Sequence, residues 1–456
     1  MNSTEFDVDV AVVGAGPTGL ALACELRLAG VTCRVLERRA DEPNITRAFA
    51  VHARTLELLD ARDMADQLVS QGIVVQEVQP APGSFLDLRP LATRYPMVLI
   101  IAQSGTERML EQRAKELGAE IVRDAEVVGL RQDGAGVTLD IEGGRSVRAR
   151  YVVGTDGAHS KVRDLIGVDF VGKQYETHII LADVMLSRPP QETLFGATGP
   201  KGLVLFVPFG DGWFRAIIWD RQREDVPLDE PVTLTELQES FRRIAGDDCG
   251  MQEPRWRTRF LSEHRQARHY GVGRVFLAGD AAHVHSPVGG QGMNTGIGDA
   301  FNLGWKLAKA VREGDQSVLD SYETERHPVG RSVLQLTDAL FRLVLSRSEL
   351  GVKARQAVIR VALKLGPVRR RLRERLSGIG IRYDRPPGAH PWVGRRMPDL
   401  STSEGRLYEV MREGGEWLVC KEGYEDPGRR LIVPDSAMRP RAVRVRPDGY
   451  VSWATD

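Results

Sequence analysis

Cysteine is scarce in this sequence of 456 residues, which contains four: Cys24, Cys33, Cys249 and Cys420. They form no C-x-x-C pair and no spacing typical of zinc ligands. This absence argues against a disulfide framework, a dithiol redox centre and a structural zinc site. We therefore expect a cytoplasmic protein without a bound metal.

An excess of charge of either sign is also lacking. Lys plus Arg and Asp plus Glu each number 62, so the net charge is zero. Overall charge then provides no attraction to nucleic acid or to an anionic membrane. The longest apolar run, residues 97–102, is far too short to cross a bilayer, and the first residues lack the pattern of a signal peptide. We expect small-molecule partners, no nucleic acid and no stable membrane association.

The sequence does contain a G-x-G-x-x-G fingerprint between an apolar, β-branched run over residues 7–13 and a stretch over residues 17–28 with helical spacing. Such a strand, tight turn and helix bind a dinucleotide pyrophosphate, because free amides and the helix dipole favour an anion. Proline suits the first helical turn. The candidate cofactor contacts here are Gly14, Gly16, Pro17, Thr18 and Gly19.

An acidic residue follows the second expected strand, residues 32–36. Glu37 lies roughly twenty residues beyond the fingerprint, the distance at which a carboxylate accepts hydrogen bonds from the adenosine ribose. A carboxylate would repel a 2′-phosphate, so this site is unsuited to NADP.

A second motif stands far along the chain, where an expected strand over residues 274–278 ends in Gly279 and Asp280. A carboxylate at this point can accept hydrogen bonds from the ribityl hydroxyls of a flavin. A glycine-rich turn over residues 287–292 follows, and a helical pattern runs from there to Gly314. The amides at that helix start would stabilise a reduced, anionic flavin. Taken singly, these features are an ordinary turn and loop, but together with the first fingerprint they predict FAD.

The spacing of apolar residues along the chain, which changes between helical and strand patterns, also indicates the order of the domains. Helices are expected over residues 54–68 and 106–117, the latter opening at a Thr106 cap, and a hairpin over 137–153 turns at Gly143 and Gly144. Strands over 203–209 and 213–219, with a helix over 235–244, indicate an inserted sheet. We predict an α/β fold with four parts. Residues 1–178 form the first part of a Rossmann-like FAD-binding domain, and residues 179–270 form a mostly β substrate domain. Residues 271–395 return to the FAD-binding domain and add helices, and residues 396–456 form a C-terminal region.

Three motifs together resemble those of the class A flavoprotein monooxygenases of the para-hydroxybenzoate hydroxylase fold. They are the first fingerprint with Glu37, the Gly154-Thr155-Asp156-Gly157 stretch with Arg163, and Gly279-Asp280 with the loop from Pro287. Within that family the stretches 48–57, 289–294 and 321–328 are most similar to aromatic polyketide hydroxylases and rifamycin monooxygenases. The likeness covers residues 5 to about 400.

The resemblance implies further contacts. Arg47 would lie near the pyrophosphate and flavin, Gln103 near the ribityl chain, and Val127 near the adenine. Arg47 and Pro287 would also position the reacting groups. The remaining cofactor candidates implied by the resemblance are Glu37, Arg38, Asp156, Asp280, Gly292, Met293 and Asn294.

The C-terminus departs from the family pattern. Residues 444–453 look like the last strands of a thioredoxin-like domain, but the stretch from residue 396 is short for a whole one. We expect a shortened thioredoxin-like remnant, which leaves open whether the chain forms a homodimer.

The implied activity is an FAD-dependent monooxygenase that consumes NADPH or NADH and dioxygen. It would hydroxylate a polycyclic aromatic, polyketide-type substrate of an antibiotic pathway through a flavin hydroperoxide. Baeyer–Villiger or antibiotic-inactivating oxygenation, a non-oxygenating FAD-dependent reductase or dehydrogenase, and a flavin-binding module without turnover remain open. The candidate substrate contacts are Phe206, Arg215, Trp219 and Pro287.

Two other features are given structural interpretations. His283 and His285 are two residues apart, but no third ligand is placed by spacing, so backbone positioning is favoured over a metal. The basic run over residues 364–375 is interpreted as a solvated helix face, in preference to a phosphate or membrane contact.

Overall fold

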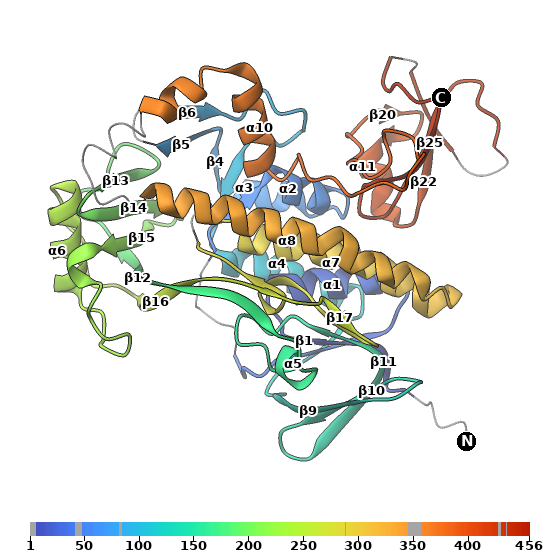
Figure 1. The fold of residues 1–456 in the computed structure, drawn as a ribbon, viewed down its shortest axis with the longest axis horizontal. Coiled ribbons are helices and arrows are strands. Elements are labelled where there is room, and N and C mark those ends of the chain that lie inside the picture. The colour runs from blue at the N-terminus through green and yellow to red at the C-terminus, as the bar shows by residue number, and fades with distance from the viewer. Residues whose placement is uncertain are drawn as a thin grey trace.

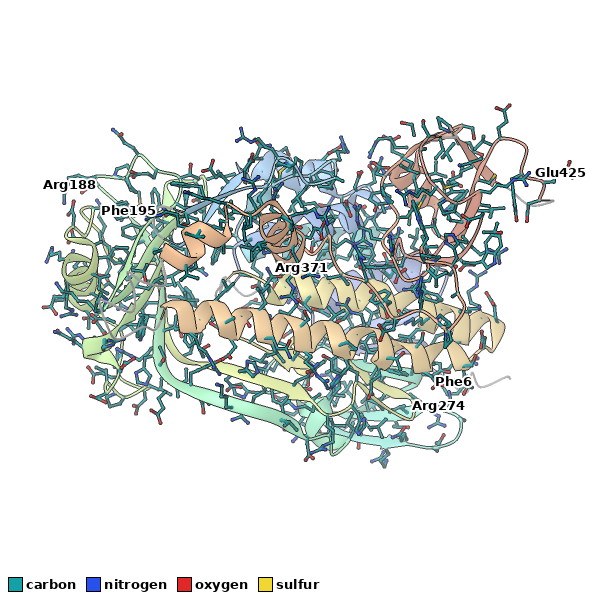
Figure 2. All side chains as sticks on the ribbon, turned by 45° about the horizontal axis from the view of Figure 1, so that its top comes forward. Phe6, Arg188, Phe195, Arg274, Arg371 and Glu425 are labelled. Atoms are coloured by element: carbon teal, nitrogen blue, oxygen red, sulfur yellow. The ribbon has the colours of Figure 1, made fainter. Side chains whose placement is uncertain are left out.

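The computed structural model describes residues 6–41, 48–81, 84–287, 289–344, 357–426, 430–434 and 436–456. The long strands β12, Phe170–Met185, and β16, Trp256–Ala267, run from the inserted sheet at one end of the molecule to the main sheet, and helix α8, Ser317–Val344, runs alongside them (Figure 1). The C-terminal region lies at the other end. Phe195 and Arg188 mark the first end, and Glu425 marks the second (Figure 2).

The main sheet has the order β17-β18-β11-β1-β2-β8, and β9 and β10 extend it beside β11. β1 is parallel to β2 and β11, and β11 is parallel to β18, so the two motif-bearing strands lie in one parallel core. The strands are β1 Val8–Val13, β2 Cys33–Leu36, β8 Glu120–Val122, β9 Val127–Gln132, β10 Val137–Ile141, β11 Arg145–Gly154, β17 Gly271–Val272 and β18 Val275–Leu277.

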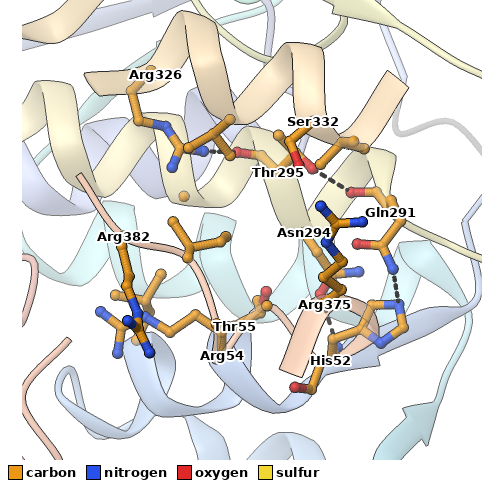
Figure 3. Close-up of a pocket in the computed structure, with 18 of the residues that line it drawn as sticks. His52, Arg54, Thr55, Gln291, Asn294, Thr295, Arg326, Ser332, Arg375 and Arg382 are labelled. Atoms are coloured by element: carbon orange, nitrogen blue, oxygen red, sulfur yellow. Dashed lines mark hydrogen bonds between the residues drawn. The ribbon is translucent and has the colours of Figure 1, made fainter. Parts of the chain in front are cut away.

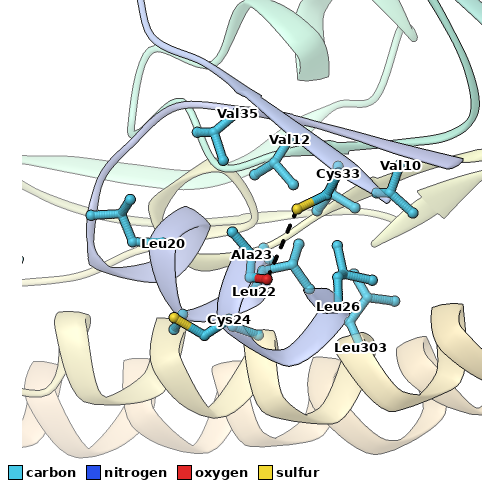
Figure 4. Packing of buried hydrophobic residues seen from close by; sticks show 14 of the residues in the cluster. Val10, Val12, Leu20, Leu22, Ala23, Cys24, Leu26, Cys33, Val35 and Leu303 are labelled. Carbon is cyan, nitrogen blue, oxygen red and sulfur yellow. Dashed lines mark hydrogen bonds between the residues drawn. The ribbon is translucent and has the colours of Figure 1, made fainter. Parts of the chain in front are cut away.

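Helix α1, Pro17–Leu28, lies between this sheet and α7, Gly292–Glu313 (Figure 4). Leu20, Leu22 and Leu26 of α1 and Leu303 of α7 are fully buried in one cluster with the apolar residues of β1 and β2. This packing fixes the starts of both helices relative to the strand ends. α4, Gln103–Glu116, packs beside α1 in this layer, and the short α5, Lys161–Leu165, packs against β9 and β11.

The inserted sheet has the order β13-β14-β15-β12-β16-β19. One face packs against α6, Leu234–Ala245, through a cluster that contains Phe206 and Phe241. The predicted boundary at residue 178 falls inside β12, at its register shift between Gln174 and His178. The strands are β12 Phe170–Met185, β13 Phe195–Gly199, β14 Gly202–Pro208, β15 Trp213–Asp220, β16 Trp256–Ala267 and β19 His283–Val284.

Two small sheets, β3-β7-β4 and β5-β6, lie against the other face of the inserted sheet, where Val207 and Ile217 join their apolar cluster. Helices α2, α3, α8 and α10 complete the part before residue 396. The elements are β3 Ala50–His52, β4 Ile73–Val75, β5 Glu77–Ala81, β6 Ser84–Asp87, β7 Val98–Ile100, α2 Ala53–Asp60, α3 Ala65–Gln71, α8 Ser317–Val344 and α10 Gly366–Leu376.

The C-terminal region forms its own sheet, β23-β22-β24-β25, around an apolar cluster that includes Trp417 and Val443. A parallel pair, β22 and β23, adjoins an antiparallel pair, β24 and β25. Its derivation from a thioredoxin-like domain stays a prediction. The elements are β20 Ser401–Thr402, β21 Gly405–Arg406, α11 Leu407–Val410, β22 Trp417–Lys421, β23 Arg430–Val433, β24 Ala442–Val445 and β25 Val451–Thr455.

Two local predictions are wrong. The expected helix over residues 54–68 is two helices, because the chain turns through Asp63, whose φ is +62°. Thr106 is fully buried inside α4, whose N-cap is Ala102, so it caps nothing. By contrast, the predicted hairpin is confirmed, with φ values of +81° and +82° at Gly143 and Gly144.

Candidate cofactor and active site

The first fingerprint turn is closed from behind by the Gly154-Thr155-Asp156-Gly157 stretch. Gly14 has a φ of +107°, and a Cβ there would lie 2.6 Å from the carbonyl oxygen of Thr155. The Thr155 hydroxyl donates to the carbonyls of Val13 and Gly14, both at 2.9 Å. Glycine is therefore required at this position, since both the backbone angle and the neighbouring strand exclude a side chain.

Helix α1 begins without a side-chain cap. Gly16 is its N-cap in an extended conformation, Pro17 occupies the first position, and no acidic residue stands in the first turn. A Cβ at Gly16 would meet nothing within 4 Å, so the backbone here faces open space. The amides at this helix start remain available to an anion, as the sequence predicted.

Helix α7 also begins without a side-chain cap, and its N-cap is Gln291. Its first turn lies close to that of α1, because a Cβ at Gly279 would lie 2.6 Å from Thr18 Oγ1 and one at Gly296 would clash with the same atom. Asp280, which is exposed, lies in the 3₁₀ turn Gly279–Ala281 beside them. Two uncapped helix starts and one exposed carboxylate thus converge from segments about 260 residues apart in the chain.

Glu37 is buried and already has four N–H donors. It accepts from the Ala15 amide at 2.8 Å and from the Arg39 amide at 3.0 Å, and it also accepts from the Arg39 guanidinium through Nε and Nη2. Burial raises the pKa of Glu37, but these hydrogen bonds outweigh it and hold the pKa below its usual range. A carboxylate has about four acceptor sites, so a ribose hydroxyl must displace the partly exposed Arg39 side chain.

Sequence reasoning named Arg38 and missed Arg39. Arg38 is exposed at the end of β2 and has no hydrogen-bond or ion-pair partner among the described residues. Its neighbour Arg39 holds the acidic acceptor, with Nε 2.8 Å from Glu37 Oε1. Two adjacent arginines cannot be distinguished by spacing, because which of them turns inward depends on how the chain leaves the strand.

Gln103 stands at the start of α4, where its side chain joins two segments. Its Oε1 accepts from the Ala48 amide at 2.9 Å, and its Nε2 donates to Glu107 Oε1 at 2.8 Å. Burial raises the pKa of Glu107 to about 7. Gln103 therefore holds the chain at Ala48, and Glu107 fixes the orientation of the Gln103 side-chain amide.

The pyrimidine-side candidates lie together at the start of α7. Asn294 accepts from the His52 amide at 2.8 Å and donates to the carbonyls of Ala50 and Gly290. Met293 is buried in the main core. Gly292 is the first residue of α7, and a Cβ there would lie 3.7 Å from Asp280 Oδ1. These residues form one corner of the site.

His285 also reaches this corner, and the sequence did not assign it to the cofactor. A Cβ at Gly292 would lie 3.7 Å from the His285 Nε2 atom. His285 Nδ1 is 2.9 Å from the Ser286 carbonyl, and Nε2 is buried with no partner among the described residues. Burial lowers the pKa of this imidazole, which leaves Nε2 as a neutral acceptor when Nδ1 donates.

His283 has a structural role. Its Nε2 lies 2.7 Å from Asp299 Oδ2, and the same carboxylate accepts from the Gly279 amide and from Arg326. Asp299 thereby anchors the turn that carries Asp280. Sequence spacing gives no sign of this role, which depends on tertiary contacts. Within the described ranges, no group of three or more His, Cys, Asp or Glu side chains is arranged to hold a metal ion.

Two other candidates lie behind the site. Val127 is buried in the core, close to Glu37 because the Ala125 amide donates to the Glu37 carbonyl at 3.0 Å. Asp156 accepts from the Ser160 hydroxyl and from the Val162 amide at the start of α5. The Asp156 side chain therefore helps to cap α5, and its predicted cofactor contact stays a prediction.

The substrate candidates divide between the two faces of the inserted sheet. Phe206 is 1% exposed and stacks on Phe241 of α6 at a centroid distance of 4.0 Å, so it belongs to the domain core. The prediction that it contacts substrate is wrong, because strand alternation turns it toward α6. Arg215 and Trp219 point to the opposite face, and both are buried.

Arg215 is fully buried beside the Asp183 carboxylate, with Nε 2.6 Å from Oδ1, and its guanidinium lies over the rings of Phe209 and Trp256. Trp219 donates from its indole to Glu224 at 2.9 Å. Pro287 lies in the turn before α7, where its carbonyl accepts from the Gly290 amide. Arg47 lies outside the described residues. The catalytic and substrate roles of these residues stay predictions.

This arrangement defines a class of protein: a dinucleotide-binding flavoprotein with an inserted sheet domain. The comparisons narrow it further. Residues 7–337 match the family described as "FAD binding domain", and the chain belongs to this family. FAD fits the observed site, because the two uncapped helix starts can accept its pyrophosphate and flavin edge, and Asp280 can accept its ribityl hydroxyls.

The chain is 41% identical to a rifampicin monooxygenase of Streptomyces venezuelae over 98% of this chain and 95% of that protein. It is 36% identical to an anhydrotetracycline monooxygenase of Streptomyces rimosus, again over 98% and 95%. Among solved structures, an anhydrotetracycline hydroxylase from Streptomyces rimosus matches with a TM-score of 0.88 at 35% identity, covering 98% of this chain and 95% of that one.

An aromatic hydroxylase from angucycline biosynthesis matches with a TM-score of 0.87 at 36% identity, covering 98% and 96%. The predicted recognition of class A FAD-dependent hydroxylases and the α/β fold class are therefore confirmed. The protein is an FAD-dependent monooxygenase with NAD(P)H as the hydride donor. A search of the described helices finds none that is both long and apolar enough to cross a membrane.

Proposed function

We propose that this enzyme hydroxylates a polycyclic aromatic substrate of the polyketide type, with NADPH or NADH as hydride donor. The observation that carries this proposal is the convergence of the α1 and α7 starts around Asp280, in a chain whose relatives are named for rifampicin and anhydrotetracycline. The bound FAD supplies oxygen activation, which is chemistry that side chains alone do not provide.

The protein's own residues bind, orient and exclude water. The open amides of Gly16, Thr18 and Gly19 suit the pyrophosphate, and Glu37 suits the adenosine ribose once Arg39 moves aside. At the other end, the start of α7 offers its dipole to negative charge on the ring. His285 Nε2 can accept a hydrogen bond from a donor at this corner. Arg47 and Pro287 would position the reacting partners.

The substrate is proposed to lie against the face of the inserted sheet that carries Arg215 and Trp219. This face meets the small sheets and α8, whose Phe341 packs beside Ile179 and Leu181. The buried Asp183–Arg215 pair stiffens the face and gives it a fixed dipole. A large, mostly apolar ring system with few polar groups suits such a lining.

The proposal is tested by incubating the FAD-loaded enzyme with NADPH, ¹⁸O₂ and a panel of polycyclic phenols. One labelled oxygen atom per NADPH consumed is expected in the product, and NADH in a parallel arm sets the donor preference. NADPH oxidation without label in any product would favour a reductase. Label in a ring-expanded ester or lactone would identify Baeyer–Villiger insertion.

A flavin-binding module without turnover deserves a specific test, because one relative, 33% identical over 97% of this chain, is a dialkyldecalin synthase, and a solved structure with a TM-score of 0.86 is a Diels–Alderase. Flavin bound but never reduced with any panel member would favour this class. Cytoplasmic location and a homodimer stay predictions.

A further inference from the structure

A cavity of about 300 Å³ lies beside the start of α7, where it shares Asn294 with the cofactor corner, and is bordered by α2, α7, α8, the end of α10 and the chain that follows it (Figure 3). Its volume is at the lower end of the range for ligand pockets, roughly 300–1,000 Å³. Its lining comes from the segments 52–58, 291–301, 326–336, 375–383 and 448–450, with none from the inserted sheet. This cavity is therefore distinct from the proposed substrate face.

The inner charges of this cavity are neutralised by partners. Arg326 is 2% exposed and pairs with Asp299 at 2.6 Å. Arg54 is 5% exposed and pairs with Glu57 at 2.9 Å. The one acidic lining residue, Asp448, is paired with Arg446 at 2.6 Å. These groups hold the walls together and leave little net charge inside.

The mouth of the cavity is cationic. Arg375, on the last turn of α10, and Arg382 both line it and are exposed. Neither side chain has a hydrogen bond or an ion pair within the described part of the chain. The nearby Arg395 has a pKa lowered by burial and by the charges of Arg382 and Arg385. Positive charge thus accumulates here in a chain of zero net charge.

The remaining lining is apolar and aromatic. Tyr383 and Tyr450 lie with ring centroids 4.2 Å apart, and Phe301, Val333 and Leu336 supply further apolar surface. The polar wall residues His52 and Asn294 are engaged with each other and with the backbone. The faces of the tyrosine and phenylalanine rings are largely covered, since Arg446 lies over both tyrosines and Arg62 over Phe301. A ligand would therefore meet the partly exposed Val333 and Leu336 inside and the Arg375 and Arg382 guanidinium groups at the entrance.

We propose that this cavity binds an acidic aromatic small molecule, with its ring system against Val333 and Leu336 and its anionic group at Arg375 and Arg382. Arginine recognises carboxylates and phenolates through paired N–H donors. This site goes beyond the proposed hydroxylation, and binding to it is measured without turnover.

The test uses the FAD-loaded enzyme and two fluorescent probes of similar ring size, 1-hydroxy-2-naphthoate and neutral 1-naphthol, titrated at pH 7.5. The naphthoate is expected to bind more tightly than the naphthol. In the Arg375→Ala/Arg382→Ala variant its Kd is expected to rise on the order of tenfold, while the Kd of the naphthol changes little. Arg371→Ala is the matched control, since Arg371 is exposed on α10 outside the cavity (Figure 2).

A second variant tests the location independently of charge. Ser332 is an exposed lining residue on α8, so Ser332→Trp is expected to fill the entrance and weaken both probes without disturbing the core. FAD content and thermal unfolding confirm that each variant is folded. Wild-type affinity for the naphthoate in both the double variant and Ser332→Trp would overturn the proposal, as would equal affinity of the wild type for the two probes.

Discussion

Charged residues gather at two regions of this molecule, the cofactor edge and the junction of the C-terminal sheet with the FAD domain, but their states differ. At the cofactor edge Asp280 and Arg38 are exposed, and two helix starts lack caps. At the junction, buried charges are paired. Arg446, for example, is 7% exposed and binds both Glu325 and Asp448 at 2.6 Å.

The junction has further buried pairs of the same kind. Arg62 is bidentate to Glu25 at 2.6 and 2.7 Å and also donates to the carbonyls of Met411 and Pro447. Lys306 reaches Glu325 at 2.8 Å. Exposed polar groups and uncapped helix starts therefore mark the ligand site, whereas buried charges that are paired with each other attach the C-terminal sheet to the FAD domain. Four substitutions test this contrast.

The largest effect is expected from Arg446→Met. Removing Arg446 leaves the buried Asp448 carboxylate and the partly buried Glu325 carboxylate without this cation, which costs about 3–5 kcal/mol of unfolding free energy. Urea unfolding measures this change, with Arg444→Met, exposed on β24, as control. FAD affinity of the folded protein should be unchanged. Equal stability of the two variants would show that the network does not hold the C-terminal sheet.

The next effect concerns Glu107, whose pKa is raised to about 7 by burial. In the unfolded chain its pKa is near 4.5. Its contribution to stability is therefore complete below about pH 4.5 and is lost as pH rises through 7, at a cost on the order of 3 kcal/mol.

Glu107→Gln removes this titration, so the variant should be more stable than wild type at pH 8, and the two should converge near pH 4.5. Thermal unfolding between pH 4.5 and 8 measures the difference. Glu116→Gln, exposed on the same helix, is the control. Parallel pH profiles of Glu107→Gln and wild type would contradict a raised pKa.

Asp280→Ala should weaken FAD binding by about 1.5–3 kcal/mol, because charge-assisted hydrogen bonds to the ribityl hydroxyls are lost. Since the carboxylate is exposed, stability without FAD should change little, in contrast to Arg446→Met. Flavin fluorescence titration of the apoprotein and its thermal unfolding separate the two effects. Wild-type FAD affinity would remove Asp280 from the cofactor site.

The smallest effect is expected from Arg38→Ala. Its side chain is exposed and without a partner in the described structure, so FAD affinity should fall only about twofold. Arg39→Ala is the variant to compare with Arg38→Ala. It removes the two guanidinium hydrogen bonds to Glu37, which frees two acceptor sites and raises the pKa of that carboxylate. Equal effects of both substitutions on FAD affinity would mean that Arg39 does not control access to Glu37.

The sequence predicted the elements that depend on local physics. Helix α1 begins and ends at the predicted residues, because Pro17 favours its first turn and leucine spacing sets its apolar face. The hairpin at Gly143 and Gly144 follows from turn chemistry in the same way. The Thr106 cap failed because a threonine within α4 carries the same local signal as one at its start.

Side-chain orientation was less predictable. Phe206 and Arg215 lie on neighbouring strands that the sequence identified, but the position of α6 decides which face is core. The motif that contains Asp156 gave no sign that this carboxylate accepts hydrogen bonds from Ser160 and Val162 at the start of α5. Spacing along a strand fixes which side chains share a face, but not what covers that face.

The sequence by itself determined the strand, glycine turn and helix around Gly14 to Gly19 and the strand end before Asp280, since these are short-range features; the dinucleotide site was predicted from them. Tertiary structure alone decided that Thr18 touches Gly279 and Gly296, that Asp299 anchors the Asp280 turn, and that Arg39 holds Glu37. These contacts join segments that only folding brings together, or depend on a side-chain rotation that the packed neighbours select.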